Sequence, residues 1–284
     1  MRLGNVDGRP AIIDSVEGLA ETAVPIHLPS SSTVDPFLAV IAHWDDAVDS
    51  VRSSPPLSIE GHRIGPPIPR PSKIVGIPVN YVDHQREMNA EHTVAGLGFF
   101  LKSPSSVIGP DGEVVLPFPH RRTDQEAELG VVIGRRASFV DRRDALDHVF
   151  GYTCLVDVTV RGSEERSTRK SFAGFTPIGP WITTADEIPD PTTLRIRGWV
   201  NDELRQDEST EKMVYGVAEL IEFISSVVTL EVGDILATGT PAGVGPVTAG
   251  DVIRVAIDSV GTLEVPVVQS LRQPHPLWLT REVG

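Results

Sequence analysis

Acidic residues stand inside two segments that otherwise have the composition of buried strands, and this combination constrains the fold most. Residues 123–134 begin polar and continue into an apolar run from Leu129 to Ile133. Glu126 and Glu128 are two positions apart, so on a strand both side chains point to the same face. Two like charges ~6.5–7 Å apart repel each other, and a divalent cation between them would remove the repulsion. The alternative is a solvated strand end that carries two glutamates.

The second segment, residues 149–160, is rich in β-branched and aromatic residues and contains Asp157. A lone carboxylate in a buried strand is strongly unfavourable unless it is paired or bound to a metal. An ion pair with Arg161 would need a bend, because that spacing is ~13 Å along an extended strand. We therefore expect Asp157 to approach Glu126 and Glu128 from a neighbouring strand. Three carboxylates around one Mg²⁺ or Mn²⁺ ion would leave coordination positions open for water and substrate.

Composition limits the class of protein. The length of 284 residues allows one large domain, or a main domain with a small appendage. The net charge of −14 argues against nucleic acid as a partner but leaves small acidic substrates possible. Cys154 is the single cysteine, so no intrachain disulfide can form and we expect a buried thiol. No run approaches the ~18 apolar residues of a membrane span, so we expect no membrane association and a cytoplasmic protein.

Two domains are predicted, with the boundary near Pro71. Residues 1–70 form a small N-terminal domain, in which Asp35 caps a helix that starts at Pro36 and continues to Val48. Proline-rich connectors follow this helix and lead into the main domain, residues 71–284.

The main domain mixes strands and helices without a regular βαβ alternation. The pattern predicts an amphipathic helix over residues 211–227 and a hairpin at the Asn201-Asp202 turn. A second hairpin is predicted around residues 259–261, and the high Gly and Pro content also favours turns. We further expect a short helix or lid after Asn80, an apolar strand over residues 97–101 and a helix near residues 142–148. The fold class is therefore α+β, with a core that consists mainly of strands.

Other residues could carry chemistry near the carboxylates. His84 and Glu87 share a face if they lie on a helix, so Glu87 could orient His84 as a general base; a solvated surface helix is the alternative. Lys170 could be drawn into the site as a cation, although most lysines are exposed. In the glycine-rich segment 239–245, backbone N–H groups and the Thr240 hydroxyl could hold a carboxylate, whereas the simpler interpretation is a tight turn.

Several motifs follow one another in order over residues 71–270. They are Asn80-Tyr-Val-Asp-His, Phe100-Leu-Lys-Ser-Pro, Glu126-Ala-Glu-Leu, Gly151-Tyr-Thr, Asp157 to Arg161, Lys170-Ser-Phe, Pro177-Ile-Gly-Pro-Trp, Val200-Asn-Asp, Thr229-Leu-Glu-Val-Gly-Asp and Thr238-Gly-Thr-Pro-Ala-Gly-Val-Gly-Pro. Taken together, these motifs resemble the fumarylacetoacetate hydrolase family. The resemblance implies a mixed β-roll fold, a homodimer, and a bound Mg²⁺ or Mn²⁺ ion.

The resemblance also implies roles for individual residues. The metal ligands fall on Glu126, Glu128 and Asp157, the catalytic residues on His84, Glu87 and Lys170, and the substrate-binding residues on Arg161, Thr240, Gly239 and Tyr81. The sequence departs from the pattern of many members after the metal aspartate. Arg161-Gly-Ser-Glu replaces Arg-Asp-x-Gln, the segment up to Lys170 is shorter, and a Trp before this lysine is absent. These departures lie beside the substrate site, so they affect the substrate and the reaction type.

These residues favour a metal-dependent hydrolase that cleaves a C–C bond in a 2,4-dioxo acid, an acylpyruvate-like substrate, during catabolism. His84, oriented by Glu87, would deprotonate a water, while the metal and Lys170 would stabilise developing negative charge. One alternative is an isomerase, decarboxylase or hydratase that acts on 2-hydroxymuconate-like or oxo-diacid substrates in aromatic degradation. Another is a binding protein that a divalent ion stabilises without turnover.

Overall fold

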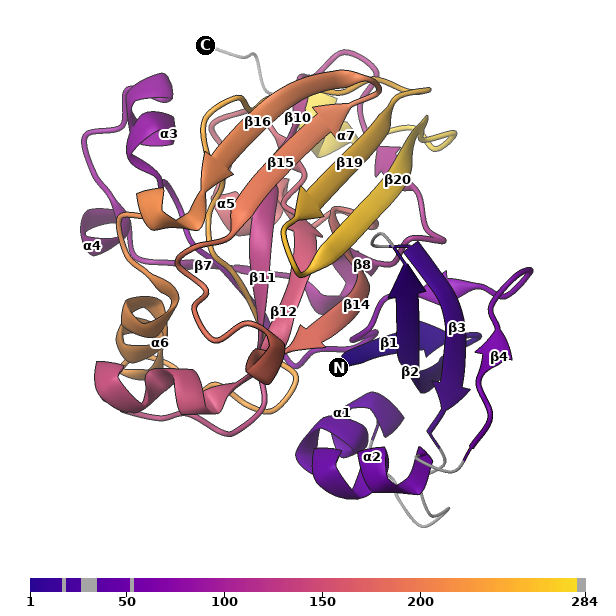
Figure 1. The fold of residues 1–284 in the computed structure, drawn as a ribbon. Helices are drawn as coiled ribbons and strands as arrows, with labels where there is room; N and C mark the ends of the chain where they lie inside the picture. Colours follow the sequence, from indigo (N-terminus) through magenta and orange to yellow (C-terminus); the bar gives the residue numbers. More distant parts are fainter. Residues whose placement is uncertain (17–18, 27–34, 52–53, 280–284) are drawn as a thin grey trace.

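The computed structural model describes residues 1–16, 19–26, 35–51 and 54–279, and strands dominate it. Two large sheets pack against each other, and the N-terminal segment lies at one side of the molecule (Figure 1). The mixed α+β class expected from the sequence is confirmed.

The larger sheet joins the N-terminal segment to the central strands, because β1 pairs antiparallel with β14. Its neighbouring strands are, in order, β4 (Leu57–Ser58), β3 (Leu19–Pro25), β2 (Arg9–Val16), β1 (Arg2–Val6), β14 (Thr176–Thr184), β12 (Val149–Val156), β11 (Ala127–Ile133), β17 (Ile235–Ala237), β6 (Ile74–Gly76) and β7 (Phe100–Lys102), with β5 (Ile64–Gly65) on β1 and β8 (Val107–Ile108) on β14.

Two smaller sheets complete the strand structure. The five-stranded sheet has the order β16 (Glu203–Ser209), β15 (Arg195–Val200), β19 (Val252–Ile257), β20 (Gly261–Gln269) and β9 (Val114–Leu116). The three-stranded sheet has the order β13 (Thr159–Val160), β10 (Thr123–Gln125) and β18 (Gly245–Pro246). Both predicted hairpins are present as β15–β16 and β19–β20, with Asn201 and Ser259 at positive φ in the turns.

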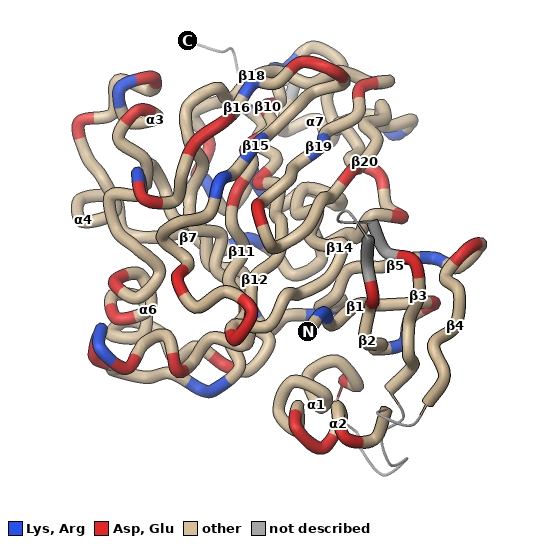
Figure 2. The backbone as a smooth tube through the Cα atoms, in the orientation of Figure 1, with Lys and Arg blue, Asp and Glu red and all other residues tan. Residues whose placement is uncertain are grey.

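The α-helices are short and lie around the sheets (Figure 1). They are α1 (Pro36–Ala42), α2 (Trp44–Val51), α3 (Val82–Glu87), α4 (Val94–Leu97), α5 (Arg166–Arg169), α6 (Val217–Ser225) and α7 (Pro276–Leu279). No helix in the described ranges is long and apolar enough to cross a membrane. Acidic and basic residues are distributed over many elements (Figure 2).

The central strand β11 is buried along its whole length because both faces of the large sheet are covered. Leu129 and Val131 belong to the core shared with the five-stranded sheet and α6, whereas Val132 packs with residues of α1 and α2. A strand covered on both faces has a continuous apolar run, as the sequence shows here. Cys154, on the adjacent β12, is buried as expected and donates a hydrogen bond to the Gly261 carbonyl.

Several predicted helices and strands have different limits. Asp35 caps α1 as predicted, since its side chain accepts from the Phe37 N–H, but the helix breaks at His43 and restarts as α2. After the break, the Trp44 ring packs edge-on against Phe150, with ring centroids 5.0 Å apart. The strand expected over 97–101 is limited to β7, because α4 occupies residues 94–97. Residues 142–148 form a 3₁₀-helix.

The amphipathic helix begins later than predicted. It occupies Val217–Ser225, whereas the spacing of apolar residues predicts a start near residue 211. Asn80 is the reason, because its backbone carbonyl accepts from the Val214 N–H and its side-chain oxygen accepts from the Tyr215 N–H. These contacts hold residues 214–215 in a bend outside the helix, and Glu219 then caps the helix by accepting from the Gly216 N–H.

Candidate active site

Three carboxylates converge where the two acidic strands are interrupted. Glu126 separates β10 from β11, and Asp157 separates β12 from β13. The antiparallel register places Ala127 opposite Val156, and the Asp157 N–H donates to the Glu126 carbonyl at 2.9 Å. With Glu128 on β11, each side chain offers an oxygen within 4.8 Å of the others. Asp157 thus approaches the two glutamates from the neighbouring strand, as the sequence predicts.

Two buried lysines bind these carboxylates. Lys170 Nζ donates to Glu126 Oε2 at 2.8 Å, to Asp157 Oδ2 at 2.5 Å and to a threonine hydroxyl. Lys102 Nζ donates to Asp157 Oδ1 at 2.5 Å and to the Phe175 carbonyl at 2.8 Å. Each oxygen of Asp157 therefore accepts from a different lysine. Lys170 was expected near the site, whereas no role was predicted for Lys102.

The surroundings give the carboxylates and lysines different pKa values. Burial favours the neutral form of Glu126, but Lys170 and Arg161 outweigh this effect and lower its pKa to about 2. Burial and the nearby charge of Asp157 raise the pKa of Glu128 well above its ordinary value. Burial lowers the pKa of Lys102, whereas the charges of Asp157 and Glu126 outweigh burial and raise the pKa of Lys170. Glu128 thus holds a proton more readily than Glu126 does.

His84 and Glu87 lie on α3 at the side of the same cavity. His84 Nδ1 is 2.8 Å from Glu87 Oε2, and Glu87 Oε1 accepts from the Gly243 N–H at 3.0 Å. If Nδ1 donates to the carboxylate, Nε2 carries the lone pair and can accept a proton. His84 is nearly buried and lines the cavity. The helix therefore holds an oriented imidazole, as the three-residue spacing predicts.

The glycine-rich loop contacts Glu128, one of the three carboxylates. The Gly239 N–H donates to Glu128 Oε2 at 2.8 Å, so it holds a carboxylate of the protein itself. Thr240 Oγ1 donates to the Ala127 carbonyl and accepts from Gln206 Nε2, while Gln206 Oε1 accepts from the Ala127 N–H. Gln206, which the sequence did not single out, therefore fastens the loop to β11. Thr240 also lines the cavity.

The remaining predicted substrate contacts occupy different places. Arg161 lines the cavity, but its Nε donates to Asp124 at 2.7 Å and its terminal nitrogen lies 2.9 Å from Glu126. Arg161 therefore pairs with Asp124 and Glu126 and not with Asp157, the partner considered in the sequence analysis. Tyr81 is buried in the core and is not among the residues that line the cavity. Its hydroxyl has no hydrogen-bond partner in the described part of the chain. Its role in substrate binding stays a prediction.

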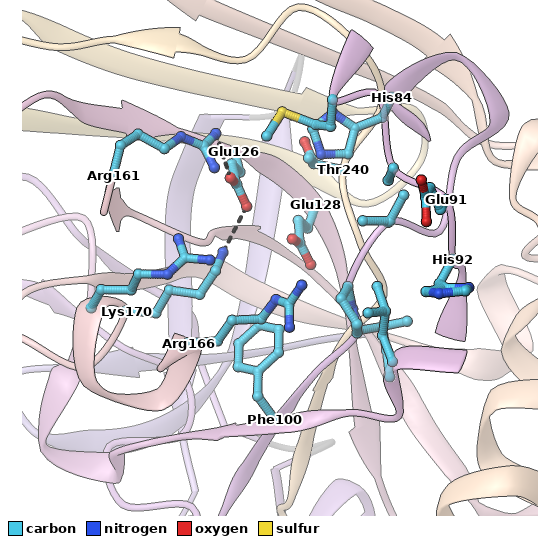
Figure 3. A pocket seen from close by; sticks show the side chains of 17 residues that line it. His84, Glu91, His92, Phe100, Glu126, Glu128, Arg161, Arg166, Lys170 and Thr240 are labelled. Carbon is cyan, nitrogen blue, oxygen red and sulfur yellow. Dashed lines mark hydrogen bonds and ion pairs between the residues drawn. The ribbon is translucent and has the colours of Figure 1, made fainter. Parts of the chain in front are cut away.

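The cavity has a volume of about 260 Å³ and combines acidic, basic and apolar walls (Figure 3). Its apolar wall includes Ile77, Val79, Leu97 and Phe100. Its charged lining includes Glu126, Glu128, Arg161, Arg166, Arg169 and Lys170. The sequence analysis did not identify Arg166 and Arg169. Their only signal was the concentration of basic residues between Arg161 and Lys170.

Comparisons with known proteins agree with this architecture. The maleylpyruvate hydrolase of Aquipseudomonas alcaligenes is 38% identical over 282 residues, which cover 94% of this chain and 96% of that protein. The crystal structure of maleylpyruvate hydrolase from Sphingobium sp. SYK-6, in complex with manganese(II) ion and pyruvate, is 37% identical with a TM-score of 0.83; the match covers 95% of this chain and all of that one. A 2-hydroxyhepta-2,4-diene-1,7-dioate isomerase from Mycobacterium marinum is 31% identical with a TM-score of 0.77, over 96% of this chain and all of that one.

Residues 73–268 match the family model described as fumarylacetoacetate (FAA) hydrolase C-terminal. This range includes the three carboxylates, both lysines, the His84–Glu87 pair and the glycine-rich loop. The resemblance found in the sequence is confirmed, and the chain belongs to the fumarylacetoacetate hydrolase family.

Proposed function

We propose that this protein is a divalent-metal-dependent hydrolase that cleaves a C–C bond of an acylpyruvate-like 2,4-dioxo acid in the catabolism of aromatic compounds. The observation that carries the proposal is one cavity lined by Glu126, Glu128 and His84. Asp157 converges with the two glutamates, and Glu87 orients the imidazole of His84. The similarity to two maleylpyruvate hydrolases over almost the whole chain supports the same reaction class.

The residues present fit a divalent metal ion. Glu126, Glu128 and Asp157 offer hard oxygen ligands, which suit Mg²⁺ and Mn²⁺. All three are nearly buried, and burial of like charges this close favours a cation between them. A bound ion would act as a Lewis acid toward the oxygens of the dioxo acid. The manganese ion in the Sphingobium maleylpyruvate hydrolase supports this assignment.

His84 would serve as the general base. Its Nε2 removes a proton from water, and the resulting hydroxide attacks the acyl carbonyl carbon, C4. The C3–C4 bond then breaks, and its electron pair remains on C3 in the enolate of pyruvate. Protonation of C3 gives pyruvate, and the acyl half leaves as a carboxylic acid. Glu87 keeps the imidazole in the tautomer and orientation that this step requires.

The cations and the loop would bind and stabilise the substrate. Lys170 carries a positive charge beside the carboxylates, where it can stabilise the oxyanion and the departing enolate. Thr240 would bind the carboxylate of the pyruvate half, with Gly239, Arg161 and Tyr81 as further predicted substrate-binding residues. Because the Thr240 hydroxyl already donates to Ala127, its backbone N–H is the donor better suited to that carboxylate.

A screen of acylpyruvates tests the proposal. Purified protein is incubated with each compound and Mn²⁺ or Mg²⁺, and pyruvate release is measured with and without EDTA. We expect metal-dependent release of one pyruvate per substrate cleaved. If no acylpyruvate yields pyruvate under any metal condition, the hydrolase proposal is wrong.

A second reaction class uses the same carboxylates without hydrolysis. The similarity to the Mycobacterium marinum isomerase favours isomerisation, decarboxylation or hydration of 2-hydroxymuconate-like or oxo-diacid substrates. These reactions need no attack of water on a carbonyl. If His84→Ala abolishes pyruvate release but spares decarboxylation of an oxo diacid, this alternative gains support.

We also propose the finer organisation that the sequence predicts. Residues 1–70 would form a small N-terminal domain appended to a catalytic β-roll, residues 71–284, in a cytoplasmic homodimer. The start of the family match at residue 73 supports the boundary, although β1 and β14 share one sheet across it. Size-exclusion chromatography with light scattering tests the dimer, because a monomer at micromolar concentration would contradict it.

A further inference from the structure

Arg121 holds the turn that leads from the proposed metal ligand Asp157 to α5. One of its terminal nitrogens donates to Glu164 Oε1 at 2.9 Å, and the other donates to Glu164 Oε2 at 2.8 Å. The second nitrogen also donates to the Arg161 backbone carbonyl at 3.0 Å. A contact of two nitrogens with one carboxylate fixes orientation as well as distance. Arg121 therefore ties both ends of the turn 161–164 to the start of β10, two residues further along the chain.

The glycine inside this turn leaves room for the ion pair. A Cβ atom at Gly162 would lie 2.2 Å from Glu164 Oε2 and 2.3 Å from a terminal nitrogen of Arg121, so a larger residue would displace the pair. The sequence departs here from the Arg-Asp-x-Gln pattern of many family members. An aspartate at position 162 would fill this space and would also repel the Glu164 carboxylate. The two departures, Gly162 and Glu164, therefore fit together as one arrangement.

Aromatic rings from α7 and from the segment before β10 pack on the arginine. The guanidinium carbon of Arg121 lies 5.3 Å from the centre of the Trp278 ring and 5.0 Å from the centre of the Phe118 ring. Both distances allow cation–π attraction. Trp278 also packs against Phe172, with ring centroids 5.4 Å apart. Trp278 thus holds the chain on both sides of Lys170, through Arg121 before this lysine and directly at Phe172 after it.

α5 connects the turn to Lys170. Arg169 Nε, on this helix, donates to the Glu164 carbonyl at 3.2 Å, and the Lys170 N–H donates to a carbonyl of the same helix at 3.0 Å. Lys170 Nζ then binds two of the proposed metal ligands. The Arg161 guanidinium is held differently, by two ion pairs with side chains of the segment 124–126. A displacement of α5 would therefore move Lys170 more than the Arg161 guanidinium.

We propose that Arg121, Glu164 and Trp278 form a brace that positions Lys170 for the chemical step. The inference rests on the proposed function, in which Lys170 stabilises the oxyanion and the departing enolate. The three brace residues are positioning residues, because none of them is among the described residues that line the cavity. They act on the reaction through α5. Glu164 is accordingly a partner of Arg121 and not a ligand of the substrate.

Kinetics of the Mn²⁺-loaded protein with maleylpyruvate test the brace. We expect Arg121→Gln to lower kcat about 10-fold and to change KM less than about two-fold, because a misplaced Lys170 weakens stabilisation of the transition state. Arg121→Lys should restore little, since an ammonium group cannot bind both carboxylate oxygens in the geometry of a guanidinium group. Trp278→Ala should lower kcat about 3-fold, and Trp278→Phe should recover most of this loss because it keeps an aromatic ring on the arginine.

Gly162→Ala tests the same pair without removing a charge. The added methyl group should displace the carboxylate and the guanidinium group, so kcat should fall as it does in Arg121→Gln. Combined with Arg121→Gln it should cause no further loss, because the pair that it displaces is already absent. Arg195→Gln is the matched control. It removes an exposed arginine that binds Asp207 with two nitrogens outside the cavity lining, and it should leave kcat and KM unchanged.

Hydrogen exchange separates this inference from the proposed function. Backbone amides of residues 165–172 should exchange about 10-fold faster in Arg121→Gln than in the wild type, and should be unaffected in Arg195→Gln. If the wild type cleaves no acylpyruvate, the proposed function fails, and unchanged exchange in this segment would overturn the brace as well. If Arg121→Gln does not fold, Gly162→Ala, which keeps both charges, takes its place in both measurements.

Three kinetic results would overturn the inference in an active wild type. The first is faster exchange with unchanged kcat, because the brace would then stabilise the loop without positioning Lys170. The second is a rise in KM with unchanged kcat in Arg121→Gln, which would make this region part of the substrate site. The third is a double variant, Gly162→Ala with Arg121→Gln, in which the two losses of kcat multiply.

Discussion

The two sides of the cavity are built in different ways. The acidic floor, formed by Glu126, Glu128, Asp157, Lys102 and Lys170, is nearly buried throughout. Its carboxylates lie on or next to the central strands β11 and β12, whereas Lys102 lies on β7 and Lys170 follows α5. Every carboxylate in it has a hydrogen bond from a buried lysine or a backbone N–H. The opposite side, the α3 wall, is a six-residue helix without a side-chain N-cap, and much of its surface is exposed.

This difference indicates a division of roles. The acidic floor contributes to stability as well as to the proposed metal site, because breaking one buried ion pair leaves the others uncompensated. The α3 wall supplies one imidazole, which is held by Glu87 and, through it, by the Gly243 N–H. Substitutions in the floor should therefore lower stability and activity together, whereas substitutions in the wall should lower activity alone.

The largest effect is expected from Asp157→Asn. This change keeps the size of the side chain but removes the charge that faces Lys102 and Lys170. Breaking such buried pairs should lower the free energy of unfolding by about 3–5 kcal/mol, and the loss of a ligand should abolish metal-dependent pyruvate release. Chemical denaturation and the pyruvate assay measure the two effects. Asp207→Asn, which removes a surface ion pair with Arg195, should cost about 1 kcal/mol or less. Equal stability losses in the two variants would contradict the role given to the floor.

His84→Ala should have a smaller overall effect than Asp157→Asn, because it should reduce catalysis and leave stability almost unchanged. Loss of the general base should lower kcat for pyruvate release by about 10²- to 10⁴-fold. Stability should change by only about 1 kcal/mol, since α3 contributes little to the core. Steady-state kinetics and thermal denaturation check both parts. His120→Ala, at an exposed position outside the cavity lining, is the control. A loss of stability as large as that of Asp157→Asn would show that the wall and the floor do not differ as described.

The next effect in size concerns Glu87, which acts through His84. Glu87→Gln removes a charge-assisted hydrogen bond to the imidazole, while the new side chain can still accept from the Gly243 N–H. We expect kcat to fall about 10-fold, with little change in KM. Kinetics of the single variants and of Glu87→Gln/His84→Ala separate the roles. Because Glu87 acts only through the imidazole, the double variant should be no slower than His84→Ala. An additional loss would indicate a direct part in the chemistry.

The sequence predicted those parts of the site that depend on local spacing. A two-residue period placed Glu126 and Glu128 together, and a three-residue spacing paired His84 with Glu87. The convergence of Asp157 with the glutamates followed from the unfavourable burial of a lone charge. Both hairpins followed from turn residues.

Features set by tertiary contacts could not be read in this way. No spacing or periodicity separates the buried Lys102 from an exposed lysine, because its burial depends on contacts with Asp157 and Phe175. The four-residue helix α5 is too short to show a periodic pattern, so Arg166 and Arg169 gave no signal of a shared face. The late start of α6 depends on Asn80, which is distant in the chain and overrides local helix propensity.

The smallest predicted effect is a pH dependence of the stabilisation that a divalent ion gives to the acidic floor. Because the pKa of Glu128 is raised in the folded, metal-free protein, this group holds a proton above the pH at which it ionises in the unfolded chain. Its burial therefore makes the metal-free protein less stable as pH rises from ~4.5 toward the raised pKa. A divalent ion must displace that proton, so its affinity should rise with pH over the same range. We expect the Tm increase caused by Mn²⁺, relative to EDTA, to be a few degrees larger at pH 8 than at pH 6. Glu128→Gln cannot lose a proton there, so the stabilisation should be weaker and less dependent on pH. A Tm increase that is larger at pH 6 would show that proton release from the floor does not accompany binding of the ion.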